Sequence, residues 1–248
     1  MKKVSLLCAA LLALTAVTAS AAPLNGGLKF RWNACLGDGG IQNKTSACTA
    51  NTGSNVMVAS FDLAGDVLGA TGIETSVDAA TAGTALPAWW TTTCRTGFIS
   101  ANPTISPSAV NCFEWASGIA GGLGAWRQGL DYGPSSGRAI MAFATATPTD
   151  VIGSAGEYFA FNLVVSNAKT AGTGNCAGCS TPACISFSNV KMVAGLNTGA
   201  IINQPAAPGS NYITWQGGAG ASSNLGSGCP AATPARNASW GAVKSLYR

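Results

Sequence analysis

The sequence contains no histidine among its 248 residues. This absence excludes Ser-His-Asp and Cys-His catalysis, because both use an imidazole as the general base. It also excludes metal sites with histidine ligands and the attachment of c-type haem, whose motif ends in histidine. No cofactor-binding loop or catalytic motif is present, so the sequence predicts no cofactor, no metal and no catalytic residue.

Charged residues are also scarce. They make up 9% of the chain, against about a quarter in an average globular domain. Without Lys2 and Lys3, which lie in the leader discussed next, the formal net charge falls from +4 to +2. There is no basic cluster, so we expect no nucleic-acid partner. The 32 glycines and many small polar residues are typical of a turn-rich β protein.

The first 22 residues have the three parts of a secretory signal peptide. Two lysines come first, an apolar run follows, and small residues precede a plausible cleavage point. The apolar run is too short to span a bilayer, and no later stretch is long and apolar enough to do so. We therefore expect residues 1–22 to be removed and residues 23–248 to form a single exported domain, secreted or at the cell surface, with no membrane span.

Eight cysteines follow the predicted signal peptide, and an even number in an exported chain indicates disulfides. Local spacing favours the pairs Cys35–Cys48 and Cys94–Cys112, with the other four cysteines pairing among themselves. The predicted disulfide cysteines are Cys35, Cys48, Cys94, Cys112, Cys176, Cys179, Cys184 and Cys229.

Alternating apolar residues predict short β-strands along most of the chain. In the strand at 157–166, we expect Phe159, Phe161, Leu163 and Val165 to share one face. The alternation slips near Asn189, which predicts a β-bulge there. The other expected strands cover residues 28–32, 54–61, 73–78, 138–146, 185–193, 201–202 and 211–215.

Residues 80–135 lack this alternation, so we expect a long irregular excursion with one helical turn near 113–117. Pro148 is expected to end the strand before it. Several short strands separated by turn residues predict an all-β fold, a single antiparallel β-sandwich with long disulfide-stapled loops.

A set of short motifs resembles an exported, cysteine-rich family of bacterial β proteins. The resemblance covers most of the mature chain. It implies one exported bacterial domain and no particular activity, substrate or catalytic residue. The motifs are Trp32-Asn33-x-Cys35, Leu86-Pro87-x-Trp89-Trp90, Glu157-Tyr158-Phe159-Ala160-Phe161, Cys176-Ala177-Gly178-Cys179 and the final residues 240–248.

The motif Cys176-x-x-Cys179 has three interpretations. It could be a redox pair, but such pairs usually precede a helix rather than lie in a Gly-rich loop. With Cys184 and Cys229 it could bind zinc, although the spacing is poor for a zinc ribbon. Structural disulfides are the favoured interpretation.

Trp89 and Trp90 are the candidate ligand-binding residues, because aromatic rings stack on sugar faces. The alternative is that they fill the core of the sandwich or pack on a disulfide. In a strand, neighbouring side chains point to opposite faces, so at most one of the two would enter the same core.

Carboxylates are the remaining candidates for acid–base chemistry. A glycosidase needs two of them about 5 to 10 Å apart. Glu74 and Asp78 would lie about 13 Å apart on one strand face, which is too far. We expect Glu74, Asp78, Glu114 and Glu157 to be solvated surface acids. Calcium at Asp38 or at residues 62–66 is a weaker possibility, since neither stretch has a full loop pattern.

These observations favour a non-enzymatic exported or cell-surface module, with polysaccharide or another surface component as its partner through Trp89 or Trp90. One alternative is a secreted polysaccharide hydrolase that uses Glu114 and Glu157. Another is a self-assembling surface protein, in which low charge and exposed strand edges favour lateral pairing.

Overall fold

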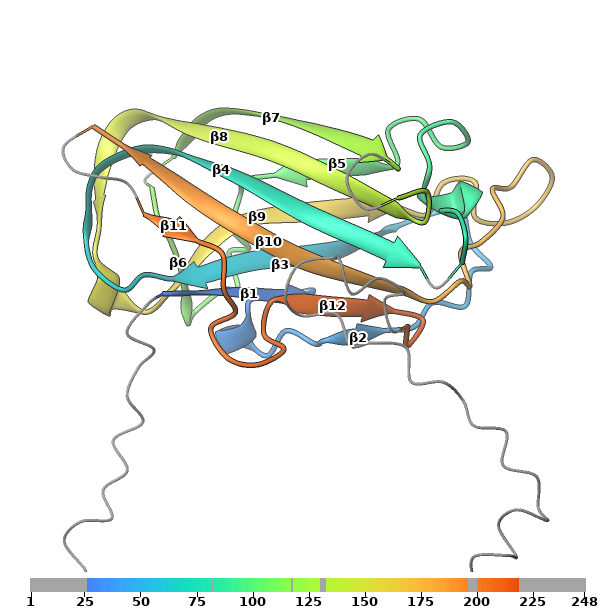
Figure 1. Ribbon diagram of the computed structural model, residues 1–248, viewed down its shortest axis with the longest axis horizontal. Helices are drawn as coiled ribbons and strands as arrows, with labels where there is room; N and C mark the ends of the chain where they lie inside the picture. The colour runs from blue at the N-terminus through green and yellow to red at the C-terminus, as the bar shows by residue number, and fades with distance from the viewer. Residues whose placement is uncertain (1–25, 82, 117, 130–132, 196–199, 219–248) are drawn as a thin grey trace, which may run out of the picture.

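Two β-sheets stacked face to face make up the described part of the chain (Figure 1). The computed structural model describes residues 26–81, 83–116, 118–129, 133–195 and 200–218. The predicted signal peptide, Cys229 and the motif at 240–248 therefore lie outside the described residues.

The five-stranded sheet has the order β1-β3-β9-β5, and β6 also pairs with β9. The seven-stranded sheet has the order β2-β12-β10-β4-β8-β7, and β11 also pairs with β10. The strands are β1 (Gly27–Trp32), β2 (Asn43–Lys44), β3 (Ser54–Asp62), β4 (Val67–Thr81), β5 (Ile99–Asn102), β6 (Cys112–Glu114), β7 (Ile119–Gln128), β8 (Ser136–Val151), β9 (Glu157–Ser166), β10 (Ala183–Ala194), β11 (Ile201–Ile202) and β12 (Tyr212–Trp215), and the short 3-10 helices are η2 (Leu36–Asp38), η3 (Ala88–Trp90) and η4 (Gly153–Ala155).

The predicted all-β sandwich is confirmed. Each strand with a clear apolar alternation forms, and its inward side chains join one core between the sheets. Among the described strands, pairing is antiparallel except for two short parallel pairs, β12 with β2 and β6 with β9. Among the described residues, no helix is long and apolar enough to cross a bilayer.

Two bulges adjust which side chains enter the core. The bulge predicted near Asn189 is confirmed by a shift in the β10–β4 register between Phe187 and Asn189. A second shift was not predicted: in the β3–β9 pair, Ala59 faces Phe161 while Ser60 faces Phe159. The extra residue turns Phe159 out of the main core and into a separate outer cluster.

The expectation for residues 80–135 is wrong, because this stretch contains η3, β5, β6 and β7. In the described part of the predicted helical turn, residues 113–116, no helical turn forms, since Cys112–Glu114 is the strand β6. The ten-residue β7 escaped prediction because its sequence, IAGGLGAWRQ, places glycine and alanine where an alternation would otherwise be visible. Gly122 is required there, since a Cβ atom would lie 2.4 Å from the Phe143 ring.

Pro148 does not end its strand either, because β8 runs on to Val151. The last β8 residue paired with β7 is Thr145. Beyond that point no described strand pairs with this side of β8, so a proline there removes no ladder hydrogen bond.

The disulfides join distant parts of the chain, so the predicted local pairs are wrong. The structure pairs Cys35 with Cys112, Cys48 with Cys179, and Cys94 with Cys176, across sequence separations of 77, 131 and 82 residues. Cys184 is also disulfide-bonded. Local spacing failed here because sandwich topology brings together loops that are far apart in sequence.

We predict that replacing Cys48 and Cys179 together by alanine lowers the free energy of unfolding by about 5 kcal/mol, because the bridge closes a very long loop in the unfolded chain. Guanidinium denaturation under non-reducing conditions measures this loss. Intact mass should show that the other disulfides remain closed. A loss below about 1 kcal/mol would contradict the entropic argument.

Candidate functional site

A hollow of about 330 Å³ lies on the outer face of the five-stranded sheet. Its floor is apolar and consists of Val56 and Val58 of β3 and Phe159 of β9. One wall is the loop before β6, and the other contains η2 and the residues that precede it. Polar side chains at the rim complete the lining: Asn33, Asp38, Ser106, Ser108 and Asn162.

Glu157 holds the η2 wall in place. The bulge in β9 directs this side chain to the same outer side as Phe159, where Oε1 accepts from the Leu36 N–H at 3.0 Å and Oε2 from the Gly37 N–H at 2.8 Å. The Ser60 hydroxyl also donates to Oε1. The carboxylate thus accepts from two backbone N–H groups at the start of η2, as an N-terminal cap does for a helix, and so holds η2 on the sheet.

The charge of Glu157 is compensated by Lys29. The Lys29 Nζ lies 3.6 Å from Glu157 Oε2 and 2.7 Å from Asp62 Oδ1. Removing one partner of such a buried set leaves an uncompensated charge, which costs more than the pair itself contributes. Glu157 is thus buried and paired, and the expectation of a solvated surface acid is wrong for it.

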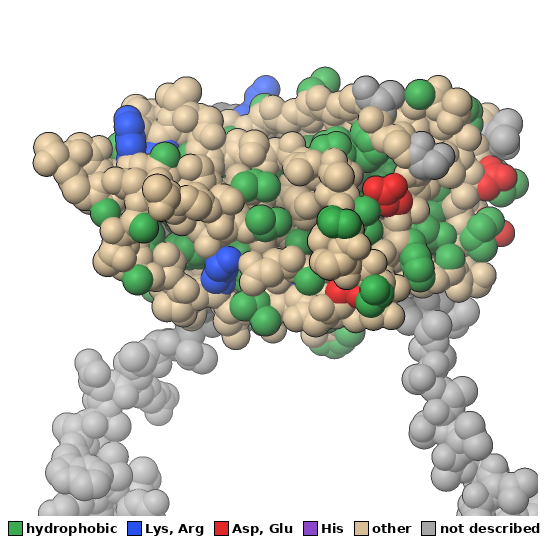
Figure 2. All heavy atoms as spheres, turned by 180° about the vertical axis from the view of Figure 1, so that it is seen from behind, with side chains coloured by type: hydrophobic (Ala, Val, Ile, Leu, Met, Phe, Trp, Pro, Cys, Tyr) green, Lys and Arg blue, Asp and Glu red, His purple; other side chains and the backbone are tan. Residues whose placement is uncertain are grey.

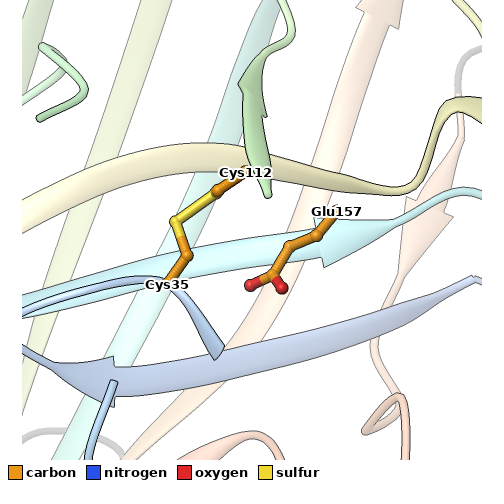
Figure 3. A group of neighbouring side chains, drawn as sticks. All are labelled: Cys35, Cys112 and Glu157. Carbon is orange, nitrogen blue, oxygen red and sulfur yellow. A yellow bond between two sulfur atoms is a disulfide. The ribbon is translucent and has the colours of Figure 1, made fainter. Parts of the chain in front are cut away.

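Beside Glu157, the Cys35–Cys112 disulfide joins the residue before η2 covalently to β6 (Figure 3). The two sulfur atoms and a Glu157 oxygen lie within 4.8 Å of one another. Sulfur atoms bonded to each other carry no thiolate charge for a metal ion, and the Glu157 oxygens already accept three hydrogen bonds. The cluster is therefore a covalent and electrostatic anchor rather than a metal centre.

Asp38, on η2, is the acidic residue of the hollow. Its Oδ1 accepts from the Val110 and Asn111 backbone N–H groups at 3.1 and 2.8 Å, and from Asn111 Nδ2 at 3.2 Å. Its Oδ2 is enclosed and has no hydrogen-bond partner among the described residues. One oxygen thus holds the opposite wall, and the other is a buried acceptor without a partner among the described residues. No local sequence pattern predicts this contact, because the two walls are more than 70 residues apart.

The other candidate acids do not form a pair with Glu157. Glu114 is exposed on β6, where its neighbour on β9 is Phe159. Glu74 is exposed and pairs with Lys191 at 2.9 Å. These two confirm the surface-acid expectation.

Asp78 contradicts the surface-acid expectation. It is fully buried, and its Oδ1 lies 2.6 Å from Arg138 Nε. The Ser188 hydroxyl donates to Oδ2. The apolar-polar alternation of its strand suggested a wet face, but burial of this part of the outer face makes Asp78 a structural acceptor.

Trp89 and Trp90 are 0% and 1% exposed, so neither offers a ring face to a sugar in this structure. They lie in η3 rather than in a strand, and a 3-10 turn can direct neighbouring side chains into one core. Trp89 stacks on Trp215 with ring centroids 5.2 Å apart, and Trp90 packs edge-on against Trp89 at 4.9 Å. The geometry favours the packing role that the sequence also allowed.

Arg95 covers the outer side of this aromatic cluster. Its guanidinium carbon lies 4.1 Å from the Trp89 ring centroid, a cation–π contact. Nη1 donates to the Trp89 carbonyl at 2.6 Å, and Nη2 donates to the Ser166 carbonyl. Burial lowers the pKa of Arg95 to about 10. Carbonyl groups and ring faces therefore replace an acidic partner at this position.

No family model matches the chain, and no curated protein matches it. Among solved structures, it is similar to a crystal structure titled "Putative membrane anchored protein" from Corynebacterium diphtheriae, at 10% sequence identity over 83% of this chain, with a TM-score of 0.25. The chain spans 39% of the length of that protein. A likeness this low carries no argument about fold or function.

We predict that Trp89→Ala lowers the free energy of unfolding by about 3–5 kcal/mol, as expected for removing a buried indole. Urea denaturation measures it, and Val110→Ala, at an exposed loop position, is the control that should change stability by less than about 0.5 kcal/mol. Unchanged stability of the Trp89 variant would contradict the packing role.

We also predict that Glu157→Gln destabilises the fold by about 1–3 kcal/mol, because an amide nitrogen cannot accept the hydrogen bonds that the carboxylate oxygen accepts. Thermal and urea unfolding give the change. Glu74→Gln is the matched control on the surface, with an expected effect within about 0.5 kcal/mol. Equal effects at the two positions would show that Glu157 does not anchor η2.

Proposed function

We propose that residues 23–248 form a single exported or cell-surface module that is not an enzyme and that binds carbohydrate in the hollow beside Asp38. The disulfides support an extracellular location, because such bonds persist in oxidising compartments. The proposed partner, a polysaccharide or another cell-surface component, is the one that the sequence suggested. The proposed site has moved from Trp89 and Trp90 to the outer face of the five-stranded sheet.

The observation that carries the proposal is that Asp38, whose enclosed Oδ2 has no hydrogen-bond partner among the described residues, lines a hollow with an apolar floor. A sugar presents hydroxyl donors at its edge and C–H groups on its face, so it matches both parts. Binding pockets in general combine an apolar lining with a few placed polar groups. Asn33 and Asn162 at the rim would supply further hydrogen-bonding groups.

The charge of the hollow favours a neutral ligand. Its described lining contains Asp38 and no lysine or arginine, so an anionic ligand would meet repulsion without compensation. Figure 2, which shows the face opposite to that of Figure 1, likewise has few charged side chains among many uncharged ones. A neutral polysaccharide is therefore the favoured class.

Rigidity of the walls also supports binding. The Cys35–Cys112 bond and the Glu157 hydrogen bonds fix η2, and Asp38 Oδ1 fixes the facing loop at Asn111. A site whose walls are held before the ligand arrives loses less conformational entropy on binding.

The test is Asp38→Asn, which keeps the Oδ1 acceptor for the loop and replaces the enclosed Oδ2 acceptor by a donor. We expect binding to neutral polysaccharides, measured by affinity electrophoresis and calorimetry, to weaken by about 10- to 100-fold, the effect of losing a hydrogen bond to a charged group. Asp150→Asn is the matched control, because Asp150 also accepts a backbone N–H, that of Gly69, at 2.8 Å but lies outside the hollow.

Equal binding by the Asp38 and Asp150 variants would contradict the site. Release of new reducing ends from a bound polysaccharide would contradict the non-enzymatic role, and Glu114→Gln would then show whether that residue takes part.

A further inference from the structure

The longest uncovered strand edge in the described part of the chain is that of β7. This strand is the last of the seven-stranded sheet and pairs only with β8 (Figure 1). The other edges are short or covered: β2 has two residues and β5 has four. The β1 edge is covered, since the N–H groups of Leu28 and Phe30 donate to the carbonyls of Gln204 and Ser210.

The middle of β7 has no device that blocks pairing with another chain. Natural edge strands usually carry lysine, proline or a bulge for this purpose. In β7 the register shift lies at one end, between Ile119 and Gly121, and the regular part from Gly121 to Gln128 contains one charge, Arg127. The backbone groups of this regular part are available to a further strand.

The outer face beside this edge is apolar. Leu123 is 73% exposed, and Ala125 is exposed two residues further along the same face. Ala125 lies opposite Ile140 of β8, which is 45% exposed. A second sheet added at β7 would continue this apolar strip and cover part of it.

The inner side of the edge borders a hollow of about 390 Å³ between β7 and β5. The residues that line it include Ser100, Ala101, Gly122, Gly124 and Trp126, and none of its lining residues is charged. A strand placed against β7 would therefore meet no charge on either of its faces until it reached Arg127.

We propose that β7 pairs with β7 of a second copy of the chain, antiparallel and around a two-fold axis that passes beside Gly124. Such an axis, normal to the sheet, joins two seven-stranded sheets into one and uses the same surface on both copies. Residues facing each other across the axis point to the same side of the sheet.

The register follows from the sequence of β7. With Gly124 on the axis, Leu123 faces the second copy's Ala125, and Trp126 faces its Gly122, so each large side chain meets a small one. All pairs from Gly121 to Arg127 then fall in the regular part of the strand. A register centred on Leu123 would instead place Arg127 opposite Ile119, at the register shift.

The test uses two double variants that change the same exposed positions. Leu123→Lys with Ala125→Lys puts like charges directly opposite each other on both sides of the axis. Leu123→Lys with Ala125→Glu puts opposite charges there instead. Sedimentation velocity over a concentration series, with circular dichroism to verify folding, compares both variants with the unchanged chain.

We expect the unchanged chain and the Lys/Glu variant to dimerise, and the Lys/Lys variant to dissociate with a dissociation constant at least about tenfold higher, since like charges directly opposite are destabilising. Ile201→Lys, at an exposed position on β11, is the control and should dimerise normally. A monomeric unchanged chain at millimolar concentration, or equal dissociation constants for the two double variants, would overturn the proposal.

Discussion

The packing of four buried indoles at one end of the sandwich is the interaction on which the rest of the structure depends. Trp32 comes from the five-stranded sheet and Trp215 from the seven-stranded sheet, and their ring centroids lie 5.8 Å apart. Trp89 and Trp90 of η3 pack against Trp215. The Trp215 Nε1 donates to the Cys179 carbonyl at 2.6 Å, which connects the cluster to the Cys48–Cys179 bridge. The indole cluster and the bridge beside it hold the two sheets together, so the loops need not contribute much to their packing.

Three buried charged side chains have different structural roles in this low-charge protein. Glu157 binds two amides of η2 to the sheet, Asp78 joins β4 to Arg138 of β8, and Arg95 is held by carbonyls and a ring face. The two buried acids each have a cation nearby, whereas Arg95 contacts carbonyl groups and a ring face instead of an acid. Glu157 was a candidate catalytic acid in the sequence. In the structure both of its oxygens already accept hydrogen bonds that hold η2 and β3. Asp38 differs, because only one of its oxygens is used.

The sequence predicted the fold class and most strands, because alternation is a local property and survives in β1, β3, β9 and β10. It missed β7, in which glycine and alanine conceal the alternation, and it misplaced Phe159, since a bulge opposite Ser60 leaves no local signal. The hollow could not be predicted, because its walls meet through contacts such as Asp38 to Asn111 that only the topology creates. The disulfide partners were missed for the same reason.

The separation of the disulfide partners also determines the order in which the fold can be completed. A chain that emerges from a ribosome or a translocation channel presents its N-terminal residues first. Cys48 must then wait for Cys179, 131 residues later, and β3 must wait for β9 before it can pair on both sides. Contacts this distant in sequence form slowly. Cys48 and Cys94 therefore lack their native partners until Cys179 and Cys176 have been made, whereas Cys35 can pair with Cys112 earlier.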